Sequence, residues 1–338
     1  MQLLRRGGRA FLLLPRAPRL AATSLELFPA QSARARLAKS LLGLALRAGL
    51  RPGLQPVNWR TASGDPFSRF LAGAAGIPGI PPFAMLAGNP RTDGQRCIFL
   101  LFNSQQIPVA VVKAGAGPAA CELVEHEERF LSSVNPKLPG IPRLHSTFRE
   151  GAVRAFAMEY CAGKSPRSES PELERILSSW LAQDCTVPLA DLPPIRNSPL
   201  RSALLETLKV GTREVCPALY HGDFAPWNIK AERTGSWTAL DWERGELEGV
   251  PLWDWLHFVV QPLILVKHVS AEGVLRQLEE LIASADVQRY VTKAKSVGIE
   301  RELTLLYLEH CIQVLRPTEG LVQLQELADG VRQTWFRH

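Results

Sequence analysis

The fold of this chain is decided by two sequences that lie about two thirds of the way along it, YHGDFAPWNIK at residues 220–230 and TALDWERG at residues 238–245. The first contains Pro226, which lacks a backbone donor and restricts the residue before it, so we expect a loop here rather than a regular helix. The strand-like residues that follow surround a polar, glycine-containing turn, which predicts a β-hairpin. Such a hairpin would return Asp241 close to Asn228.

Three side chains of this stretch can bind or orient charged oxygens, namely Asp223, Asn228 and Asp241. Two oxygen ligands at adjacent strand ends suit Mg²⁺, which takes few protein ligands when phosphate oxygens and waters complete its shell. Asp223 lies outside that pair and is available to hold a hydroxyl group. A single His-Gly-Asp sequence is also a common turn, but the intervals to Asn228 and Asp241 favour a phosphoryl-transfer site.

The pattern HGDFxPxN at residues 221–228, followed by LDWE at 240–243, resembles the catalytic and metal-binding loops of the aminoglycoside phosphotransferase and choline kinase family. These enzymes are small-molecule relatives of the protein kinases. The resemblance covers roughly residues 83–335 and is most specific at 221–254. It offers no motif for residues 1–80.

The resemblance implies a role for each residue of the motif. Asp223 would be the catalytic base, while Asn228 and Asp241 would bind Mg²⁺, with Asp241 in the place of the protein-kinase DFG aspartate. His221 matches the leading histidine of the motif, and we expect it to hold the loop rather than to transfer protons. Asp254 would accept backbone hydrogen bonds from the catalytic loop.

The resemblance also implies the fold class, an α+β, two-lobed protein-kinase-like fold. We expect a basic, partly helical segment over residues 1–80, a small antiparallel-sheet N-lobe over 81–162 and a mostly helical C-lobe over 163–338. Apolar, β-rich runs separated by short turns predict an antiparallel meander in the N-lobe; these runs are residues 83–87, 96–103 and 108–113. Apolar residues spaced by three and four predict helices over 271–338.

The third of these runs ends on Lys113, ahead of a helix predicted over residues 118–134. This order resembles the way kinases build the ion pair that orients the α- and β-phosphates of ATP. Four glutamates of the helix compete as the partner of the lysine; these are Glu122, Glu125, Glu127 and Glu128. The family places an acid four residues before a leucine, which selects Glu127. At least two of the others would form an acidic, solvated face.

The run at residues 155–160 resembles the hinge strand of kinases, in which backbone groups of Glu159 and Tyr160 would meet adenine. A simple edge strand explains the same residues equally well. His257 lies on the predicted helix that carries Asp254, and we expect it to be a core histidine with satisfied hydrogen bonds.

The composition is typical of a globular protein, with 46% hydrophobic and 21% charged residues. The six cysteines are scattered without metal-site spacing, which indicates free thiols in a reducing compartment and a cytoplasmic location. No stretch approaches the ~20 apolar residues of a membrane helix.

The net charge of +6 is unevenly distributed, because residues 1–60 hold eleven Lys or Arg and one acid. Such a segment can contact anionic lipid or nucleic acid, and it is also typical of an organellar transit peptide. A basic amphipathic helix predicted over residues 31–50 more often packs its leucines onto its own chain than onto a membrane. We therefore expect no nucleic-acid partner, and peripheral membrane contact through residues 1–60 stays an alternative.

The predicted function is phosphoryl transfer from ATP, with Mg²⁺, to a hydroxyl group of a small molecule such as an aminoglycoside, a sugar or an amino alcohol. The alternative is a pseudokinase-type protein that binds a nucleotide or metabolite and regulates a partner. A pure binder has no need of Lys113, Asp223, Asn228 and Asp241 together, which favours the enzyme.

Overall fold

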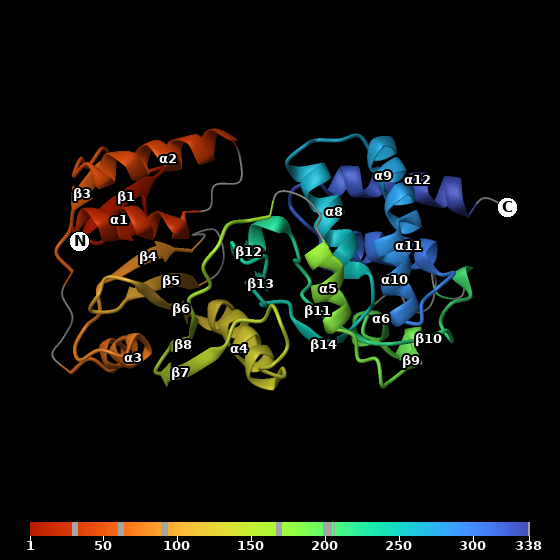
Figure 1. Ribbon diagram of the computed structural model, residues 1–338, viewed down its shortest axis with the longest axis horizontal. Helices are drawn as coiled ribbons and strands as arrows, with labels where there is room; N and C mark the ends of the chain where they lie inside the picture. The colour runs from red at the N-terminus through yellow and green to blue at the C-terminus, as the bar shows by residue number, and fades with distance from the viewer. Residues whose placement is uncertain are drawn as a thin grey trace. The chain divides into compact units, whose positions relative to one another are not determined.

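The computed structural model describes residues 1–28, 33–59, 64–88, 94–166, 171–198, 205 and 207–336. The chain separates into two compact units (Figure 1). One unit comprises Met1–Ser133 with Pro142–Cys161, and the other comprises Val134–Ile141 with Ala162–His338. The first is built on an antiparallel sheet and the second is mostly helical, which confirms the predicted α+β, kinase-like fold class.

The first unit contains an antiparallel sheet with the strand order β3-β1-β2-β4-β5-β6-β8-β7 in its described residues. Its strands are β1 (Gln2–Arg6), β2 (Arg9–Leu14), β3 (Leu54–Pro56), β4 (Phe83–Ala87), β5 (Gln95–Phe102), β6 (Pro108–Ala116), β7 (Leu144–Glu150) and β8 (Val153–Glu159). The predicted meander corresponds to β4, β5 and β6, which pair in that order. The sheet therefore extends beyond the predicted meander on both sides.

Strand β2 was not predicted, because its sequence Phe11-Leu12-Leu13-Leu14 lacks the apolar–polar alternation of a strand with one solvated face. Leu12 and Leu14 pack into a cluster on one side of the sheet, and Leu13 packs into a cluster on the other side. A strand buried on both faces is expected to be apolar throughout. The same run was too short for a membrane helix and carried no other signal.

Helices cover both faces of this sheet. Helices α1 (Pro18–Ser24) and α2 (Ala33–Arg47) pack with Leu12, Leu100 and Phe102, while α3 (Pro66–Ala75) packs on the opposite face with Phe99 and Leu101. Figure 1 shows α1 and α2 on the side of the sheet away from α3. Helix α4 (Pro118–Ser133) packs against β6 and β8. Residues 1–60 thus supply strands and a covering helical layer.

In its described residues, the second unit contains mostly helices, together with three short strand pairs. The helices are α5 (Pro171–Ser179), α6 (Pro193–Arg196), α8 (Trp253–Leu265), α9 (Ala271–Ala283), α10 (Ala285–Lys293), α11 (Glu300–His310) and α12 (Leu321–Trp335). The strand pairs are β9 (Val187–Pro188) with β10 (Glu214–Val215), β11 (Ala218–Tyr220) with β14 (Glu246–Gly249), and β12 (Ile229–Ala231) with β13 (Trp237–Ala239). The helices predicted over 271–338 are therefore present.

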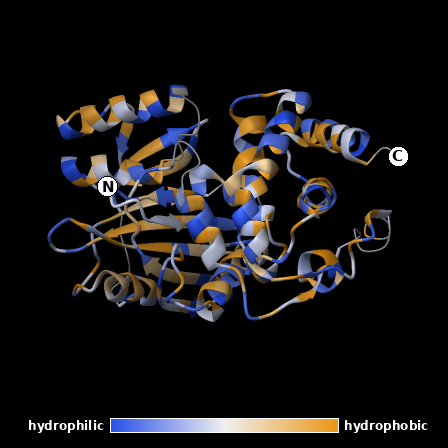
Figure 2. Ribbon diagram, turned by 45° about the vertical axis from the view of Figure 1, so that its right-hand side comes forward, coloured by the Kyte–Doolittle hydropathy of each residue, from blue (hydrophilic) through white to orange (hydrophobic). Residues whose placement is uncertain are grey.

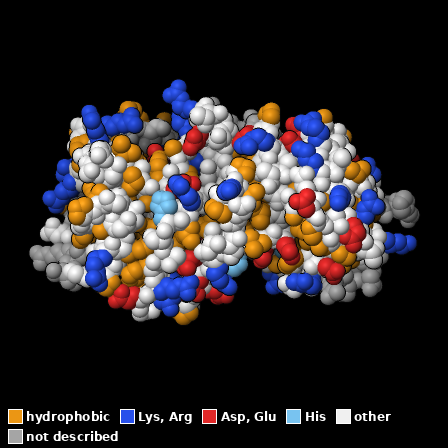
Figure 3. Space-filling view, turned by 60° about the horizontal axis from the view of Figure 1, so that its bottom comes forward, with side chains coloured by type: hydrophobic (Ala, Val, Ile, Leu, Met, Phe, Trp, Pro, Cys, Tyr) orange, Lys and Arg blue, Asp and Glu red, His pale blue; other side chains and the backbone are white. Residues whose placement is uncertain are grey.

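The surface is mixed in character. Figure 2 shows hydrophobic and hydrophilic residues alternating along the helices of both units. On the face seen in Figure 3, basic and acidic side chains lie interspersed with hydrophobic ones. The helices that the structure describes include none long and apolar enough to cross a membrane. None of the six cysteines, all of which the structure describes, forms a disulfide.

Candidate active site

The predicted hairpin is present at the centre of the motif. Strands β12 and β13 pair through Ile229 with Ala239 and Ala231 with Trp237. Leu240 donates its backbone N–H to the carbonyl of Asn228 at 2.7 Å. The residue before Asp241 is therefore hydrogen-bonded to Asn228, as the spacing predicted.

The loop ahead of this hairpin is held on a buried aromatic platform. Phe224 and Trp242 are fully buried, and both rings contact Trp180, at centroid distances of 5.4 and 5.1 Å. The indole of Trp242 donates to the Ala239 carbonyl at 2.9 Å, which ties the platform to β13. Aromatic contacts of this kind fix orientation as well as burying area. The polar residues of the loop are consequently carried by a rigid base.

His221 joins the loop to the end of β13. Its Nε2 lies 2.8 Å from the Leu240 carbonyl, and its Nδ1 accepts a hydrogen bond from the Asp223 backbone N–H at 3.2 Å. Burial lowers the pKa of His221 to about 4, although Asp223 and the Leu240 carbonyl act in the opposite direction. A fully buried, neutral imidazole with both nitrogens engaged fits the expected loop-holding role better than proton transfer.

Asp254, in the first turn of α8, binds the backbone of the same loop. Its Oδ2 accepts from the His221 N–H at 2.7 Å, and its Oδ1 accepts from the Gly222 N–H at 3.2 Å. Burial raises its pKa to about 7, against the effect of these two hydrogen bonds. Gly222 has φ 77°, and a Cβ there would lie 2.8 Å from Arg244 Cβ, so the turn requires glycine. The pairing predicted for Asp254 is present in the structure.

Asp223 is held at both carboxylate oxygens. Its Oδ2 accepts from Asn228 Nδ2 at 2.8 Å, and its Oδ1 lies 3.0 Å from Nε2 of His257. Burial alone would raise the pKa of Asp223, but the hydrogen bond and charge of His257, together with His221, lower it below the ordinary value. The side chain is still 36% exposed. The result is an ionised, oriented carboxylate that a small molecule can reach.

His257 is the residue whose role the sequence did not reveal. It is buried, as predicted for a core histidine, but its Nε2 faces Asp223 and its Nδ1 lies 3.2 Å from the hydroxyl of Tyr307 on α11. One signal was available in the sequence. Asp254 and His257 are three positions apart on a helix, so they share a face, and Asp254 was already predicted to touch the loop.

Asn228 and Asp241 have the chemistry that a magnesium ion requires. Because Asn228 Nδ2 donates both to the Asp223 carboxylate and to its carbonyl, the amide oxygen points elsewhere and can ligate a hard cation. Asp241 has φ 72°, a left-handed conformation that aspartate tolerates better than most residues. Among the described residues, no three or more His, Cys, Asp or Glu form a metal site. Mg²⁺ bound with phosphate needs only one or two carboxylates.

In the sheet unit, Lys113 pairs with Glu127. Its Nζ lies 2.7 Å from both carboxylate oxygens, and the side chains are 12% and 2% exposed. The competing glutamates have other surroundings, since Glu125 binds Arg154 at 2.7 Å and Glu128 binds Arg149 at 2.9 Å. Glu122 is exposed to solvent. The geometry thus selects Glu127 from the four acids of α4.

Backbone groups at the end of β8 are hydrogen-bonded within the sheet. The backbone N–H of Glu159 donates to Arg143 O at 2.9 Å, and that of Tyr160 donates to Val109 O at 3.3 Å. The Tyr160 hydroxyl binds the carboxylate of Glu26. The alternative of an edge strand is wrong, because β8 lies between β6 and β7. An adenine contact here stays a prediction, and these two N–H groups are already used.

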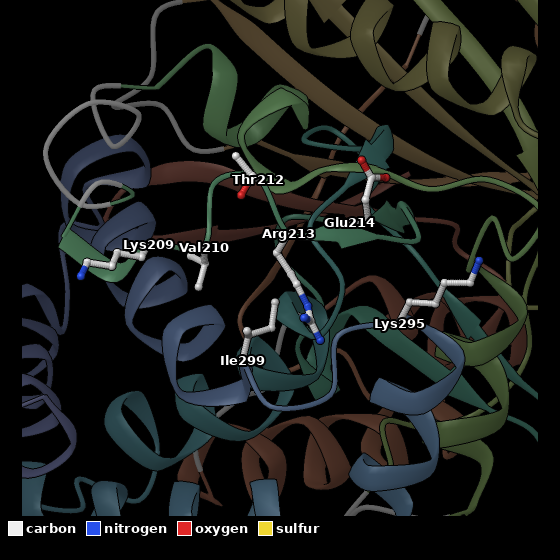
Figure 4. A pocket seen from close by; sticks show the side chains of 7 residues that line it. All are labelled: Lys209, Val210, Thr212, Arg213, Glu214, Lys295 and Ile299. Carbon is white, nitrogen blue, oxygen red and sulfur yellow. The ribbon is translucent and has the colours of Figure 1, made fainter.

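A cavity of about 620 Å³ lies elsewhere in the helical unit and shares no residue with the motif (Figure 4). Its lining is Lys209, Val210, Thr212, Arg213, Glu214, Lys295 and Ile299. The cationic side chains are exposed, and Arg213 donates to the Val297 carbonyl at 3.1 Å. Ser198 as N-cap and Pro199 in the first turn predict a helix to about Glu214. Residues 199–204 and 206 of that range lie outside the described residues, 205, 207 and 208 are helical, and Glu214 belongs to β10.

No family model matches the chain, and no curated protein matches it. Among solved structures, it is similar to the aminoglycoside phosphotransferase APH(4)-Ia, in a ternary complex with ADP and hygromycin B, at 13% identity and a TM-score of 0.48. That match covers 80% of this chain and 99% of the other. A second is the phosphotransferase APH(3'')-Id from Streptomyces rimosus, at 14% identity, a TM-score of 0.40 and coverages of 72% and 97%. Both of these neighbours are aminoglycoside phosphotransferases, members of the family that the sequence motif resembles.

Proposed function

We propose that this protein is a kinase for a small molecule, which transfers the γ-phosphoryl group of ATP to a hydroxyl group. The observation that carries the proposal is the arrangement of Asp223. An aspartate that is fixed at both oxygens by Asn228 and His257, yet partly open to solvent, is suited to orient an attacking hydroxyl.

In the proposed step, Asp223 accepts the proton of the acceptor hydroxyl as the hydroxyl oxygen bonds to the γ-phosphorus. The bond between that phosphorus and the bridging β–γ oxygen breaks, and ADP leaves with the bonding electrons. A carboxylate with a lowered pKa is a weak base. This suits phosphoryl transfer, in which positioning and electrostatic stabilisation contribute more than proton abstraction.

The remaining residues of the motif would serve ATP. Asn228 and Asp241 would hold Mg²⁺, which when bound neutralises charge on the phosphate oxygens. Lys113, fixed by Glu127, would orient the α- and β-phosphates. Adenine would meet backbone groups at Glu159 and Tyr160 other than the two N–H donors already used in the sheet. His221 and Asp254 would position the loop without contacting substrate.

The test is ADP formation by the purified chain with Mg-ATP and three panels of acceptors: sugars, choline-like amino alcohols and aminoglycosides. With an acceptor found, Asp223→Ala and Asp241→Ala should each lower turnover by about a hundredfold or more. Asp184→Asn, at an exposed aspartate of the same unit, is the matched control and should leave turnover unchanged. Near-normal turnover in a folded Asp223→Ala protein would contradict the assignment.

The same screen tests the regulatory alternative. A pseudokinase-type binder would show a thermal shift with Mg-ATP but no ADP formation with any acceptor. The four motif side chains, Lys113, Asp223, Asn228 and Asp241, support the enzyme over the binder. Binding without turnover across all three panels would favour the binder instead.

A further inference from the structure

Helix α2 is the part of the sheet unit whose sequence the proposed function does not use. Its inner side is anchored, because Leu46 is buried in the cluster with Leu20 and Leu25, and Leu42 packs against that cluster. Lys39 on the same helix donates to the Phe28 carbonyl at 3.1 Å. The helix is therefore held at a defined orientation, and its outer side faces away from the core.

The outer side of α2 is also apolar. Leu37, Leu41 and Leu44 are 62%, 58% and 62% exposed. Their spacing of four and three residues places them on one line along the helix, over a length of about 10 Å at 1.5 Å per residue. In Figure 2, α2 carries hydrophobic and hydrophilic residues side by side along its length. A helix that already buries one leucine side has no packing reason to present a second to solvent.

Cationic side chains flank this leucine line. At 100° per residue, Arg34 falls on one side of the line, and Arg36 and Arg47 fall on the other; all three are exposed. No acidic residue occurs between Glu26 and Asp65. The surface therefore combines a narrow apolar centre with a positive border, and residues 27–64 contain no acid that could neutralise it. This contrasts with the mixed charges seen in Figure 3.

The leucine line and its border of arginines together distinguish among three candidate partners. A second copy docked through α2 would bring the same arginines together without an intervening acid, which is unfavourable. A nucleic acid would use the arginines but leave the central leucines in water. The surface of an anionic membrane satisfies both groups, since leucines enter the boundary between headgroups and acyl chains while arginines remain at the phosphates.

We propose that α2 is a docking element for anionic lipid surfaces, with Leu37, Leu41 and Leu44 inserted and Arg34, Arg36 and Arg47 at the headgroups. The contact is peripheral, because three leucines and a few arginines give reversible rather than permanent attachment. It is independent of the proposed phosphoryl transfer, whose residues lie on other elements.

The experiment is co-sedimentation of the full chain with vesicles of phosphatidylcholine alone or of phosphatidylcholine with phosphatidylserine. We expect binding to the anionic vesicles to be at least about tenfold tighter and to weaken as salt is raised. The variant Leu37→Ser/Leu41→Ser/Leu44→Ser and the variant Arg34→Gln/Arg36→Gln/Arg47→Gln should each reduce that binding by about tenfold or more. The exposed valines Val266, Val297 and Val322, changed together to serine, are the matched control and should bind as the unmodified chain does.

Each other outcome overturns the proposal. Equal binding to neutral and anionic vesicles would show that the arginines do not contribute. No binding to either kind of vesicle would show that α2 does not dock on lipid surfaces. Unchanged binding of the leucine variant would mean adsorption by charge alone. A dimer in light scattering that the leucine variant abolishes, without vesicle binding, would identify a second copy as the partner. Thermal unfolding of every variant at the normal temperature shows that the fold is intact, and ADP formation reports the proposed enzyme separately.

Discussion

The hydrogen-bond chain Asp223–His257–Tyr307 fixes the direction of the proposed base. Burial raises the pKa of Tyr307 well above its ordinary value, so its hydroxyl keeps its proton and can donate to Nδ1 of His257. An imidazole that accepts this hydrogen bond at Nδ1 carries a proton on Nε2, directed at Oδ1 of Asp223. One oxygen is thereby assigned to His257 and the other to Asn228.

Replacing His257 by alanine should lower kcat about 10- to 100-fold, the cost of losing one hydrogen bond to a charged group. The KM for ATP should stay unchanged, because the hydrogen bond of His257 goes to Asp223, which is proposed to meet the acceptor hydroxyl and not ATP. Tyr307→Phe should have the same kind of effect but a smaller one, since the imidazole remains. Steady-state kinetics with the identified acceptor measure both. A folded His257→Ala protein with normal kcat would exclude the positioning role.

A second buried histidine makes stability depend on pH. His310 packs against Trp253 at a centroid distance of 4.7 Å, and burial, followed by Arg244, lowers its pKa to about 4. The unfolded chain binds this proton near pH 6.5. The stability from the neutral ring is therefore fully present above about pH 6.5 and is lost as the pH falls towards 4.

The variant His310→Phe keeps an aromatic ring and removes the titration. At pH 5 the histidine costs about 2 kcal/mol relative to pH 7, and the variant should avoid this cost. We expect a smaller difference in melting temperature between pH 7.5 and pH 5 than in the unmodified chain. His221, whose pKa is also lowered, leaves part of the acid sensitivity in place. An identical pH dependence in both proteins would contradict the assignment to His310.

At the scale of elements, α4 offers three acids in neighbouring positions with different partners. Glu127→Gln should raise the KM for ATP about tenfold or more, because it removes the charge that fixes Lys113 in a nearly buried site. Glu125→Gln is the matched control, since its partner Arg154 and the acid itself are partly exposed. Titration with ATP, monitored by kinetics and thermal shift, compares the two. If Glu125→Gln raised the KM for ATP as much as Glu127→Gln, the negative charge of α4 as a whole, and not the Lys113–Glu127 pair, would be responsible.

The elements differ in how far the sequence could define them. The hairpin β12–β13 was predictable because proline, glycine and alternating apolar residues act locally. Strand β2 was not, because Leu12, Leu13 and Leu14 face two different helical layers that no local pattern reveals. The same holds for β8, whose inner position depends on β7 pairing with it.

The residues of the candidate site also differ in how far the sequence could define them. Asp223, Asn228 and Asp241 lie in one short stretch, so their spacing carried the hypothesis. His257 on α8 reaches Asp223, and Tyr307 on α11 reaches His257. Only the packing of elements far apart in the sequence brings these side chains together. Helical spacing from Asp254 was the one hint, and it did not distinguish a partner of the base from a core residue.

At the scale of the whole molecule, the basic N-terminal segment is a structural part of the sheet unit. Strand β2 pairs with β4 through Leu12 and Leu13, and Leu12, Leu14, Leu20 and Leu25 cover buried residues such as Leu100 and Phe102. The Tyr160 hydroxyl at the end of β8 also binds Glu26. A removable transit peptide would not be expected to supply a strand and part of the core.

Deleting residues 1–60 should therefore destabilise the sheet unit rather than merely remove charge. Several large buried leucines are lost, each contributing about 1.5–3 kcal/mol, and β4 becomes an uncovered edge. We expect poor solubility, strong binding of a hydrophobic dye and no cooperative unfolding of this unit. The Leu37→Ser/Leu41→Ser/Leu44→Ser chain is the control, because those leucines are exposed, and it should unfold normally. A soluble, cooperatively unfolding deletion would show that residues 1–60 are an accessory segment after all.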